Sequence, residues 1–326
     1  MDVSVTIVGW NRSDLLASCL RSVFATPRSV DYEVIVVDNA SQDDSVAMVR
    51  AAFPHATLLA SARNLGFARA QNQAIGVARG RYVLMLNPDA TIRPDTIPTL
   101  LRLMARHPTV GALGCAEDRQ RGLGTATSGA FLDYPSLART SGENLWAALR
   151  PPRTVDLRWL LDPVRRWMGE ELREVDVLEV AWCVGALLFV RREALAQVGG
   201  FDEQFFLFDE DLDLCRRMRE AGWRIAFTTE TRFSHVGGAS SALRDDIGRI
   251  PGQSRRWYFQ KHHGRVAAAL FHLQHVILHQ GLLAWRRRLG GWAAGSGGRV
   301  VEVAHDGERL GRRREHEPAS LGTAQD

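Results

Sequence analysis

Two hydrophobic patterns alternate along the first 115 residues. Short runs of consecutive apolar residues, typical of buried strands, recur between segments whose apolar residues lie three or four positions apart, as on one face of a helix. The expected strands are 3–8, 33–37, 56–60, 81–86 and 110–114, and the expected helices are 13–24, 42–52, 67–78 and 95–106. This alternation predicts an α/β fold with a parallel, doubly wound sheet, which binds ligands at the carboxyl ends of its strands.

The pattern is weaker beyond residue 115. Residues 116–176 are rich in Gly, Pro, Arg and Trp and are expected to form an insertion with some helix near 157–168. The pattern then returns in an apolar run at 177–191, an acidic helix at 208–221, short strands at 224–227 and 232–235, and a helical region at 241–285. From about residue 290 the apolar periodicity is lost, which predicts a mobile tail.

Composition places the chain among ordinary soluble enzymes, since 45% of its 326 residues are hydrophobic and 24% are charged. Wholesale disorder, a collagen-like repeat and a coiled coil are thereby excluded. The four cysteines form no CxxC pair, so a reducing, cytoplasmic compartment is expected rather than a disulfide framework or a zinc ribbon. The strand-like opening and the lack of about 18 consecutive apolar residues predict neither a secretory signal nor a spanning helix.

The net charge of +4 comes almost entirely from arginine, since Lys261 is the only lysine. Over most of the chain these arginines are spread widely, with carboxylates between them. Nucleic-acid binding usually concentrates basic residues on one element, with aromatic residues among them. No nucleic-acid partner is therefore expected.

Polar and aromatic side chains follow three of the predicted strands. Trp10 and Asn11 follow the first strand, Asp38 follows the second, and Asn87 and Asp89 follow the fourth. In a parallel sheet these ends share one crevice, where an aromatic ring can stack on a base, one carboxylate can accept from a base or ribose, and another can hold a divalent metal. The alternative is that the two carboxylates only cap the turns and helices that follow them.

A glycine opens the helix expected at 67–78. Gly66 follows Arg63 and Asn64, and its missing side chain would let the backbone approach a ligand. The helix N-terminus would then present free N–H groups to an anion, and Arg63 could reach a phosphate or a base.

Four carboxylates within five residues, 209–213, follow an aromatic run in the second half. Clustered carboxylates raise one another's pKa, which suits a general base. A solvated acidic helix start is the alternative, although the preceding apolar run argues against full exposure. His235 ends a predicted strand and could complete a metal site with Asp89.

Five strings in this order resemble the family 2 inverting glycosyltransferases, and more narrowly their bacterial rhamnosyltransferase-like branch: VSVTIVGWNRSDLLASCLRSV, VIVVDNAS, RNLGFARAQNQAIGVARGRYVLMLNPDA, GGFDEQFFLFDEDLDLCRRMREAGWR and FSHVGG. The resemblance covers about residues 2–240. It implies the two-lobed nucleotide-diphospho-sugar transferase (GT-A) fold, with a mostly parallel central sheet and C-terminal helices. The implied organisation is a nucleotide-sugar-binding lobe at 1–115, an acceptor-binding and catalytic lobe at 116–240, a helical region at 241–289 and a mobile tail at 290–326.

The resemblance also implies roles for individual residues. Asn87-Pro88-Asp89 stands in the place of the family's metal-binding DxD motif, so Asp89 would hold Mg²⁺ or Mn²⁺ together with His235. Asp211, in the Glu210-Asp211 pair, matches the catalytic base. The residues expected to bind the donor are Trp10, Asn11, Asp38, Arg63, Asn64, Gly66, Asn87 and Asp89, with Asp38 on the pyrimidine and Trp10 stacked on the base.

The implied activity is inverting transfer of a sugar, first of all rhamnose from dTDP-rhamnose, to a hydroxyl of a bacterial cell-surface glycan or lipid-linked acceptor. A UDP-hexose donor and a noncatalytic glycan-binding scaffold remain as alternatives. A sugar-phosphate nucleotidyltransferase is disfavoured, because it would need a glycine-rich phosphate loop with a lysine near the N-terminus.

Residues 265–288 combine spaced apolar residues with the cluster Trp285-Arg286-Arg287-Arg288. An amphipathic helix with an arginine cluster can lie on an anionic membrane, so peripheral contact with the inner face of the cell membrane is one expectation. The alternative is a helix packed on the catalytic lobe.

Overall fold

A computed structural model of the chain describes residues 1–118, 130–131, 133–137, 176–238 and 249–276. The helix expected near 157–168 and the tail expected from 290 lie outside these residues. Among the described helices, none combines the length and the apolar character needed to cross a membrane.

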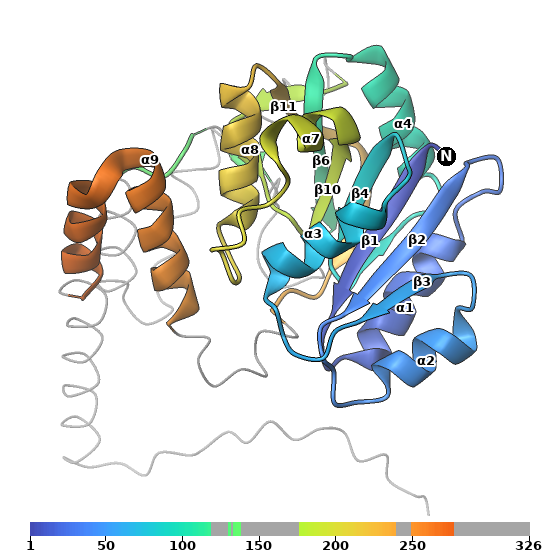
Figure 1. Cartoon of the computed structure of the whole chain (residues 1–326). Coiled ribbons are helices and arrows are strands. Elements are labelled where there is room, and N and C mark those ends of the chain that lie inside the picture. The colour runs from blue at the N-terminus through green and yellow to red at the C-terminus, as the bar shows by residue number, and fades with distance from the viewer. Residues whose placement is uncertain (119–129, 132, 138–175, 239–248, 277–326) are drawn as a thin grey trace, which may run out of the picture. The chain divides into compact units, whose positions relative to one another are not determined.

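The central element is a nine-stranded sheet with the order β3-β2-β1-β4-β10-β6-β11-β5, in which β8 also pairs with β11 (Figure 1). Its strands are β1 (Val3–Gly9), β2 (Tyr32–Asp38), β3 (Thr57–Ala60), β4 (Tyr82–Leu86), β5 (Ala90–Ile92), β6 (Val110–Asp118), β8 (Leu178–Val180), β10 (Leu187–Arg191) and β11 (Arg224–His235). Only β5, β8 and β10 run against the other six strands. The sheet is therefore mostly parallel, as predicted. A separate two-stranded sheet pairs β7 (Ala130–Phe131) with β9 (Trp182–Cys183).

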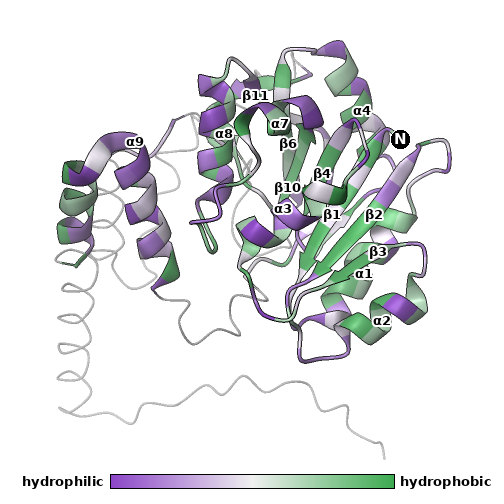
Figure 2. Ribbon diagram, in the orientation of Figure 1, coloured by the Kyte–Doolittle hydropathy of each residue, from purple (hydrophilic) through white to green (hydrophobic). Residues whose placement is uncertain are grey.

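Helices cover both faces of the central sheet (Figure 1). The described helices are α1 (Ser13–Phe24), α2 (Ser45–Ala52), α3 (Phe67–Val77), α4 (Thr96–Arg106), α7 (Arg192–Val198), α8 (Glu210–Glu220) and α9 (Ile250–Gln274). In β2, Val34 and Val36 join the core formed with α1, α2 and α4, whereas Ile35 and Val37 join the core formed with α3, α7 and α8. Because both faces are buried, most strand positions are apolar, as Figure 2 shows, and the polar residues Ser4 and Thr6 of β1 are buried as well.

The structure differs from the expected elements in a few places. β5 has only three residues and lies at the sheet edge, and α7 follows β10 with no intervening loop, so neither produces a separate hydrophobic pattern. The two short strands expected at 224–227 and 232–235 are one strand, β11, whose pairing with β6 shifts register between Thr228 and Arg232. That irregularity divides the hydrophobic pattern in two.

β10 connects the two stretches of sequence that were expected to form separate lobes. It lies antiparallel between β4 and β6, so a strand from the second stretch is built into the sheet of the first. Immediately before β10, the carbonyl of Ala186 accepts a hydrogen bond from the backbone N–H of Asn87 at 3.0 Å. The end of β4 and the start of β10 therefore meet where the site is found.

Candidate active site

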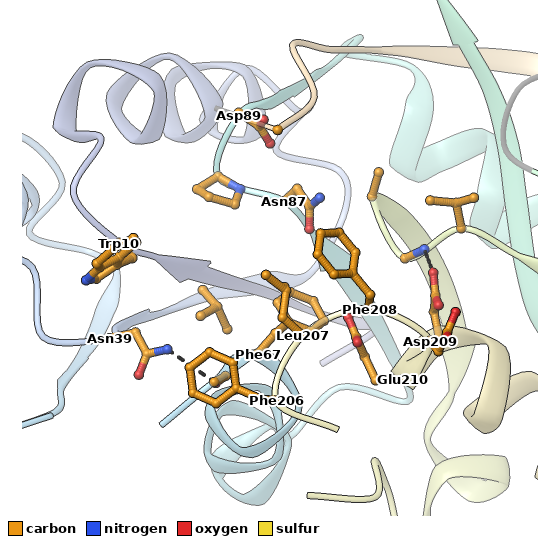
Figure 3. Close-up of a pocket in the computed structure, with 18 of the residues that line it drawn as sticks. Trp10, Asn39, Phe67, Asn87, Asp89, Phe206, Leu207, Phe208, Asp209 and Glu210 are labelled. Atoms are coloured by element: carbon orange, nitrogen blue, oxygen red, sulfur yellow. Dashed lines mark hydrogen bonds between the residues drawn. The ribbon is translucent and has the colours of Figure 1, made fainter. Parts of the chain in front are cut away.

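A cavity of about 370 Å³ lies at the carboxyl ends of the parallel strands. Of the residues predicted for the site, those that line it are Trp10, Asn64, Gly66, Asn87, Asp89, Glu210, Asp211 and His235. Figure 3 shows Trp10 and Asn39 on one side of this cavity and Phe208 and Glu210 on the other. The side chains predicted to hold a metal and those predicted to act as a base therefore share one space.

Asp89 and His235 form a close pair, because β5 and β11 pair with Ala90 opposite His235. His235 Nε2 lies 3.2 Å from Asp89 Oδ1, and the backbone N–H of Gly237 donates to Asp89 Oδ2 at 3.1 Å. Glu117 Oε1 lies 3.7 Å from the other ring nitrogen of His235. Burial alone would lower the pKa of His235, but the hydrogen bond and charge of Asp89, helped by Glu117, outweigh burial and raise it.

The Asp89–His235 pair fits a divalent cation that is shared with a substrate. Asp89 Oδ1 and His235 Nε2 lie 3.2 Å apart, close enough for one cation to bind both. In the part of the chain that the structure describes, no three His, Cys, Asp or Glu side chains come together as a metal site. Mg²⁺ commonly takes few protein ligands and completes its shell with water and substrate phosphates, so two ligands suffice for such a site.

Glu210 and Asp211, the carboxylate pair at the start of α8, lie in different environments. Asp211 Oδ2 accepts the backbone N–H of Gly185 at 2.6 Å, and its Oδ1 accepts the backbone N–H of Leu212 at 2.7 Å. Glu210 is buried, and its Oε2 has no hydrogen-bond partner among the residues that the structure describes. Two N–H donors stabilise an ionised carboxylate, whereas burial without donors stabilises the neutral acid.

The pKa values of this pair follow from those contacts. Burial raises the pKa of Asp211 to about 6, against the lowering effect of the Gly185 and Leu212 N–H groups. Burial, with the nearby charge of Asp211, raises the pKa of Glu210 well above its ordinary value. Of the two, Glu210 is therefore the weaker acid, and Asp211 loses its proton first. A half-buried carboxylate that is ionised yet basic is suited to accept a proton.

Three predicted residues, Asn11, Asp38 and Arg63, do not line the cavity. Asn11 joins two loops, since its N–H donates to Ser41 Oγ at 3.0 Å and its Oδ1 accepts the N–H of Gln42 at 2.6 Å. Asp38 is buried at the end of β2, where its Oδ2 accepts the N–H of Ser41. Arg63 is exposed. Their predicted contacts with a donor stay predictions.

Gly66 lines the cavity, but its missing side chain makes room for protein rather than for a ligand. At φ 82° a Cβ would lie 2.6 Å from the carbonyl oxygen of Phe206, and that oxygen accepts the N–H of Phe67 at 2.7 Å. The expectation that the N-terminus of α3 presents free N–H groups to an anion is therefore wrong at Phe67. The reason is a tertiary contact with a segment 140 positions away, which no local pattern reveals.

Asn39 was not predicted and proves central to this side of the cavity. Its Nδ2 donates to Asn64 Oδ1 at 3.0 Å and to the Gly66 carbonyl at 3.2 Å, while its Oδ1 accepts the N–H of Leu65 at 2.8 Å. One amide thus fixes the loop between β3 and α3. Its position beside Asp38, at the end of a buried strand, was a usable signal. Gly185, whose N–H binds Asp211, was also not predicted as a site residue. The sequence signal for it was that it interrupts the apolar run at 177–191.

The fold and the cavity define a GT-A glycosyltransferase architecture. A solved structure described as a mannosyltransferase from Pyrobaculum calidifontis in complex with GDP-Man and Mn²⁺ superposes with a TM-score of 0.53, at 20% identity, over 91% of this chain and 76% of that one. At that identity the likeness shows the fold alone.

Sequence comparison identifies the family. The family described as Glycosyl transferase family 2 matches residues 4–155, and Glycosyl transferase family group 2 matches residues 164–296. An N-acetylglucosaminyl-diphospho-decaprenol L-rhamnosyltransferase of Mycobacterium tuberculosis is 31% identical over 245 residues, 72% of this chain and 75% of the relative. A rhamnosyltransferase of Escherichia coli K12 is 24% identical over 69% of this chain and 80% of its own length. The chain belongs to glycosyltransferase family 2, and these two relatives are rhamnosyltransferases.

Proposed function

We propose that the protein is an inverting, metal-dependent glycosyltransferase that transfers rhamnose from dTDP-rhamnose to a hydroxyl of a lipid-linked saccharide during cell-surface glycan assembly. The observation that carries the proposal is the single cavity lined by both the Asp89–His235 pair and the Glu210–Asp211 pair. The names of the two relatives support rhamnose as the sugar. The name of the M. tuberculosis relative also supports an acceptor linked to a polyprenyl diphosphate.

Asp211 acts as the general base in this proposal. Its carboxylate is ionised at neutral pH and removes the proton of the acceptor hydroxyl as that oxygen attacks the anomeric carbon. Glu210, whose pKa burial raises well above its ordinary value, is the weaker acid of the pair. A single attack from the side opposite the leaving diphosphate inverts the anomeric centre.

Asp89 and His235, which line the same cavity, would hold Mg²⁺ or Mn²⁺. When bound, the ion supplies positive charge that stabilises the departing diphosphate. Asn87 lies beside them, with its Nδ2 at 3.4 Å from His235 Nε2.

The donor nucleotide binds along the ends of β1 and β2. Trp10 stacks on the base, and Asp38 supplies an acceptor for the pyrimidine, since its buried Oδ1 has no hydrogen-bond partner within the described residues. Asn64 and Gly66 line the adjoining wall, and the exposed Arg63 reaches the donor from outside.

The decisive experiment compares wild type with Asp211→Asn. Transfer is measured with dTDP-rhamnose, UDP-glucose and UDP-N-acetylglucosamine in the presence of Mn²⁺. We expect Asp211→Asn to bind the donor normally and to lose at least about 100-fold in kcat, the usual scale for a missing general base. Asp14→Asn, which changes an exposed acid in α1, is the matched control and should retain activity.

Two further results of that experiment decide between the alternatives. EDTA should abolish activity and Mn²⁺ or Mg²⁺ should restore it, so full activity in chelator would exclude the metal. Turnover with a UDP-sugar alone would replace rhamnose by a hexose. Donor binding without transfer or hydrolysis in wild type would favour a noncatalytic glycan-binding scaffold.

The second half of α9 supports a membrane partner for the same enzyme. After the break at Gly264, Val266, Leu270 and Leu273 are exposed on one side of the helix, whereas Ala268 and Phe271 are buried on the other. Exposed apolar rows of this kind mark interaction sites. Residues 247–301 contain nine Arg or Lys and no Asp or Glu, which complements an anionic lipid surface.

Vesicle sedimentation tests the membrane contact. Full-length protein should bind phosphatidylglycerol vesicles, and the variant Val266→Ser/Leu270→Ser/Leu273→Ser should bind much less. Val77→Ser alters an equally exposed apolar residue on α3 and should leave binding unchanged. If wild type does not bind anionic vesicles, the second half of α9 is not a membrane contact.

A further inference from the structure

The segment before the carboxylate pair has an unusual backbone. Phe208 has φ 70° and Asp209 has φ 63°, although neither is glycine. A Cβ disfavours this left-handed region, and a bulky residue such as phenylalanine is rarely found there. Such a conformation persists only where the surrounding structure imposes it.

Two helices hold the backbone of this segment at its ends. The N–H of Phe67, the first residue of α3, donates to the carbonyl of Phe206 at 2.7 Å. The N–H of Asp213, in α8, donates to the carbonyl of Asp209 at 2.9 Å. These bonds fix where the turn begins and ends, but neither involves a side chain of the turn.

The first half of α9 holds the middle of the turn. Ser254 Oγ donates to the carbonyl of Leu207 at 2.7 Å. Arg255 donates through Nε and Nη2 to the two carboxylate oxygens of Asp209, each at 2.8 Å. A planar guanidinium bound to both oxygens fixes orientation as well as distance, and both side chains are largely shielded from water.

We propose that Arg255 is a positioning residue of the transfer reaction: by clamping Asp209, it fixes the left-handed turn that orients Asp211. Arg255 is not among the side chains that line the cavity, so its effect passes through Asp209. The inference rests on the proposed role of Asp211 as the base. The inference gives α9 a role in catalysis, although Arg255 lies 46 positions after Asp209 in the sequence.

Because Asp209 is charged, the contact between Arg255 and Asp209 should also affect the pH dependence of kcat. The charged and titratable groups near Asp211 are Glu210, Asp209, Cys183 and Cys215. The negative charge of Asp209 raises the pKa of Asp211. Arg255 forms an ion pair with Asp209 and so offsets that charge. Removing Arg255 should therefore shift the acidic limb of the kcat profile to higher pH, whereas Asp209→Asn should shift it to lower pH.

The test compares Arg255→Gln, Arg255→Lys and Asp209→Asn with wild type, using the donor that wild type turns over. Arg256→Gln is the matched control, because Arg256 is the exposed neighbour on the same helix. We expect kcat of Arg255→Gln to fall about 10- to 100-fold, the scale of a misplaced catalytic group, with donor KM and dTDP affinity unchanged. Arg255→Lys, which keeps the charge but loses the fork, should fall in between.

Each outcome decides the matter. Wild-type kcat in Arg255→Gln overturns the inference, and so does a loss of donor affinity as large as the loss of kcat. Should Arg255→Gln fail to fold, Asp209→Asn decides: a reduced kcat with the acidic limb at lower pH supports the clamp, and unchanged kinetics overturn it. Absence of transfer by wild type would instead overturn the proposed function.

Discussion

Asp213 offers the sharpest test of what holds α8 in place. Its side chain is fully buried, yet two cationic groups and a histidine surround it: Arg217 Nε at 2.7 Å, Lys261 Nζ at 2.8 Å and His262 Nε2 at 2.7 Å. Two of these come from α9, so the cluster joins the two helices. Replacing Asp213 by Asn would keep the shape of the side chain and remove the charge that the cluster surrounds.

The size of the effect follows from the pKa of Asp213. Burial would raise it, but the hydrogen bond of His262 and the charges of Arg217 and Lys261 outweigh burial and lower the pKa from 3.8 to about 2. At about 1.4 kcal/mol per pKa unit, this difference contributes about 2 kcal/mol to the free energy of unfolding. A lowered pKa stabilises the folded state above about pH 4, and the contribution is lost as the pH falls towards 2, with about half gone at pH 3.

Urea unfolding of Asp213→Asn and of Glu220→Gln measures this contribution. Both variants remove the acid of an i, i+4 pair with arginine on α8, but the Glu220 side chain is 57% exposed. At pH 7 we expect Asp213→Asn to lose about 3–5 kcal/mol, because it leaves buried cations unpaired. Glu220→Gln should lose less than about 1 kcal/mol.

The pH dependence checks the cause. Between pH 5 and pH 3 the stability difference between wild type and Asp213→Asn should shrink by about 1 kcal/mol, since only wild type titrates at this position. A loss in Asp213→Asn no larger than in Glu220→Gln would refute the reasoning. A difference that stays constant between pH 5 and pH 3 would show that packing, and not charge, is responsible.

Three shorter predictions concern the cavity and its glycines. The kcat for transfer should rise with pH through about 6 and then level off, because Asp211 accepts a proton only when ionised; a flat profile from pH 5 to 7 would exclude it as the base. Gly66→Ala, just before α3, should destabilise the protein by about 2 kcal/mol or more and lower its melting temperature, since the new Cβ meets the backbone of Phe206 at positive φ. Gly76→Ala, within α3 and in open space, should raise the melting temperature. Gly185→Ala should lower kcat about tenfold with little change in melting temperature, because the new Cβ would lie 3.2 Å from Asp211 and displace it. An unchanged kcat would show that this contact does not position Asp211.

Local pattern was sufficient for most of the sheet. β1, β2 and β4 are buried on both faces, so their sequences are rich in apolar residues. α1 coincides with the helix expected at 13–24. The prediction was weakest where a tertiary contact decides the structure. β5 exists because three residues pair with β11 at the sheet edge, and the order β4-β10-β6 depends on a strand from about 100 positions away.

The strand-end rule explains which part of the site could be predicted. Because parallel strands deliver their carboxyl ends to one edge, Trp10, Asn87 and Asp89 could be placed together from sequence alone, and all three line the cavity. The clamp of Asp209 by Arg255 joins residues 46 positions apart and depends on the docking of α9. No spacing rule connects such residues, and a positive φ at Phe208 leaves no mark in the sequence.

The acidic cluster at 209–213 shows why the number of carboxylates is a poor guide to their function. Asp209 and Asp213 lie one helical turn apart and are both paired with cations of α9, whereas Glu210 and Asp211 lie towards the cavity. In the described residues neither Glu210 nor Asp211 forms an ion pair, and burial raises the pKa of both, while the pKa of Asp213 is lowered. Helical periodicity thus divides one run of acids into two that hold α9 and two that are available for proton transfer.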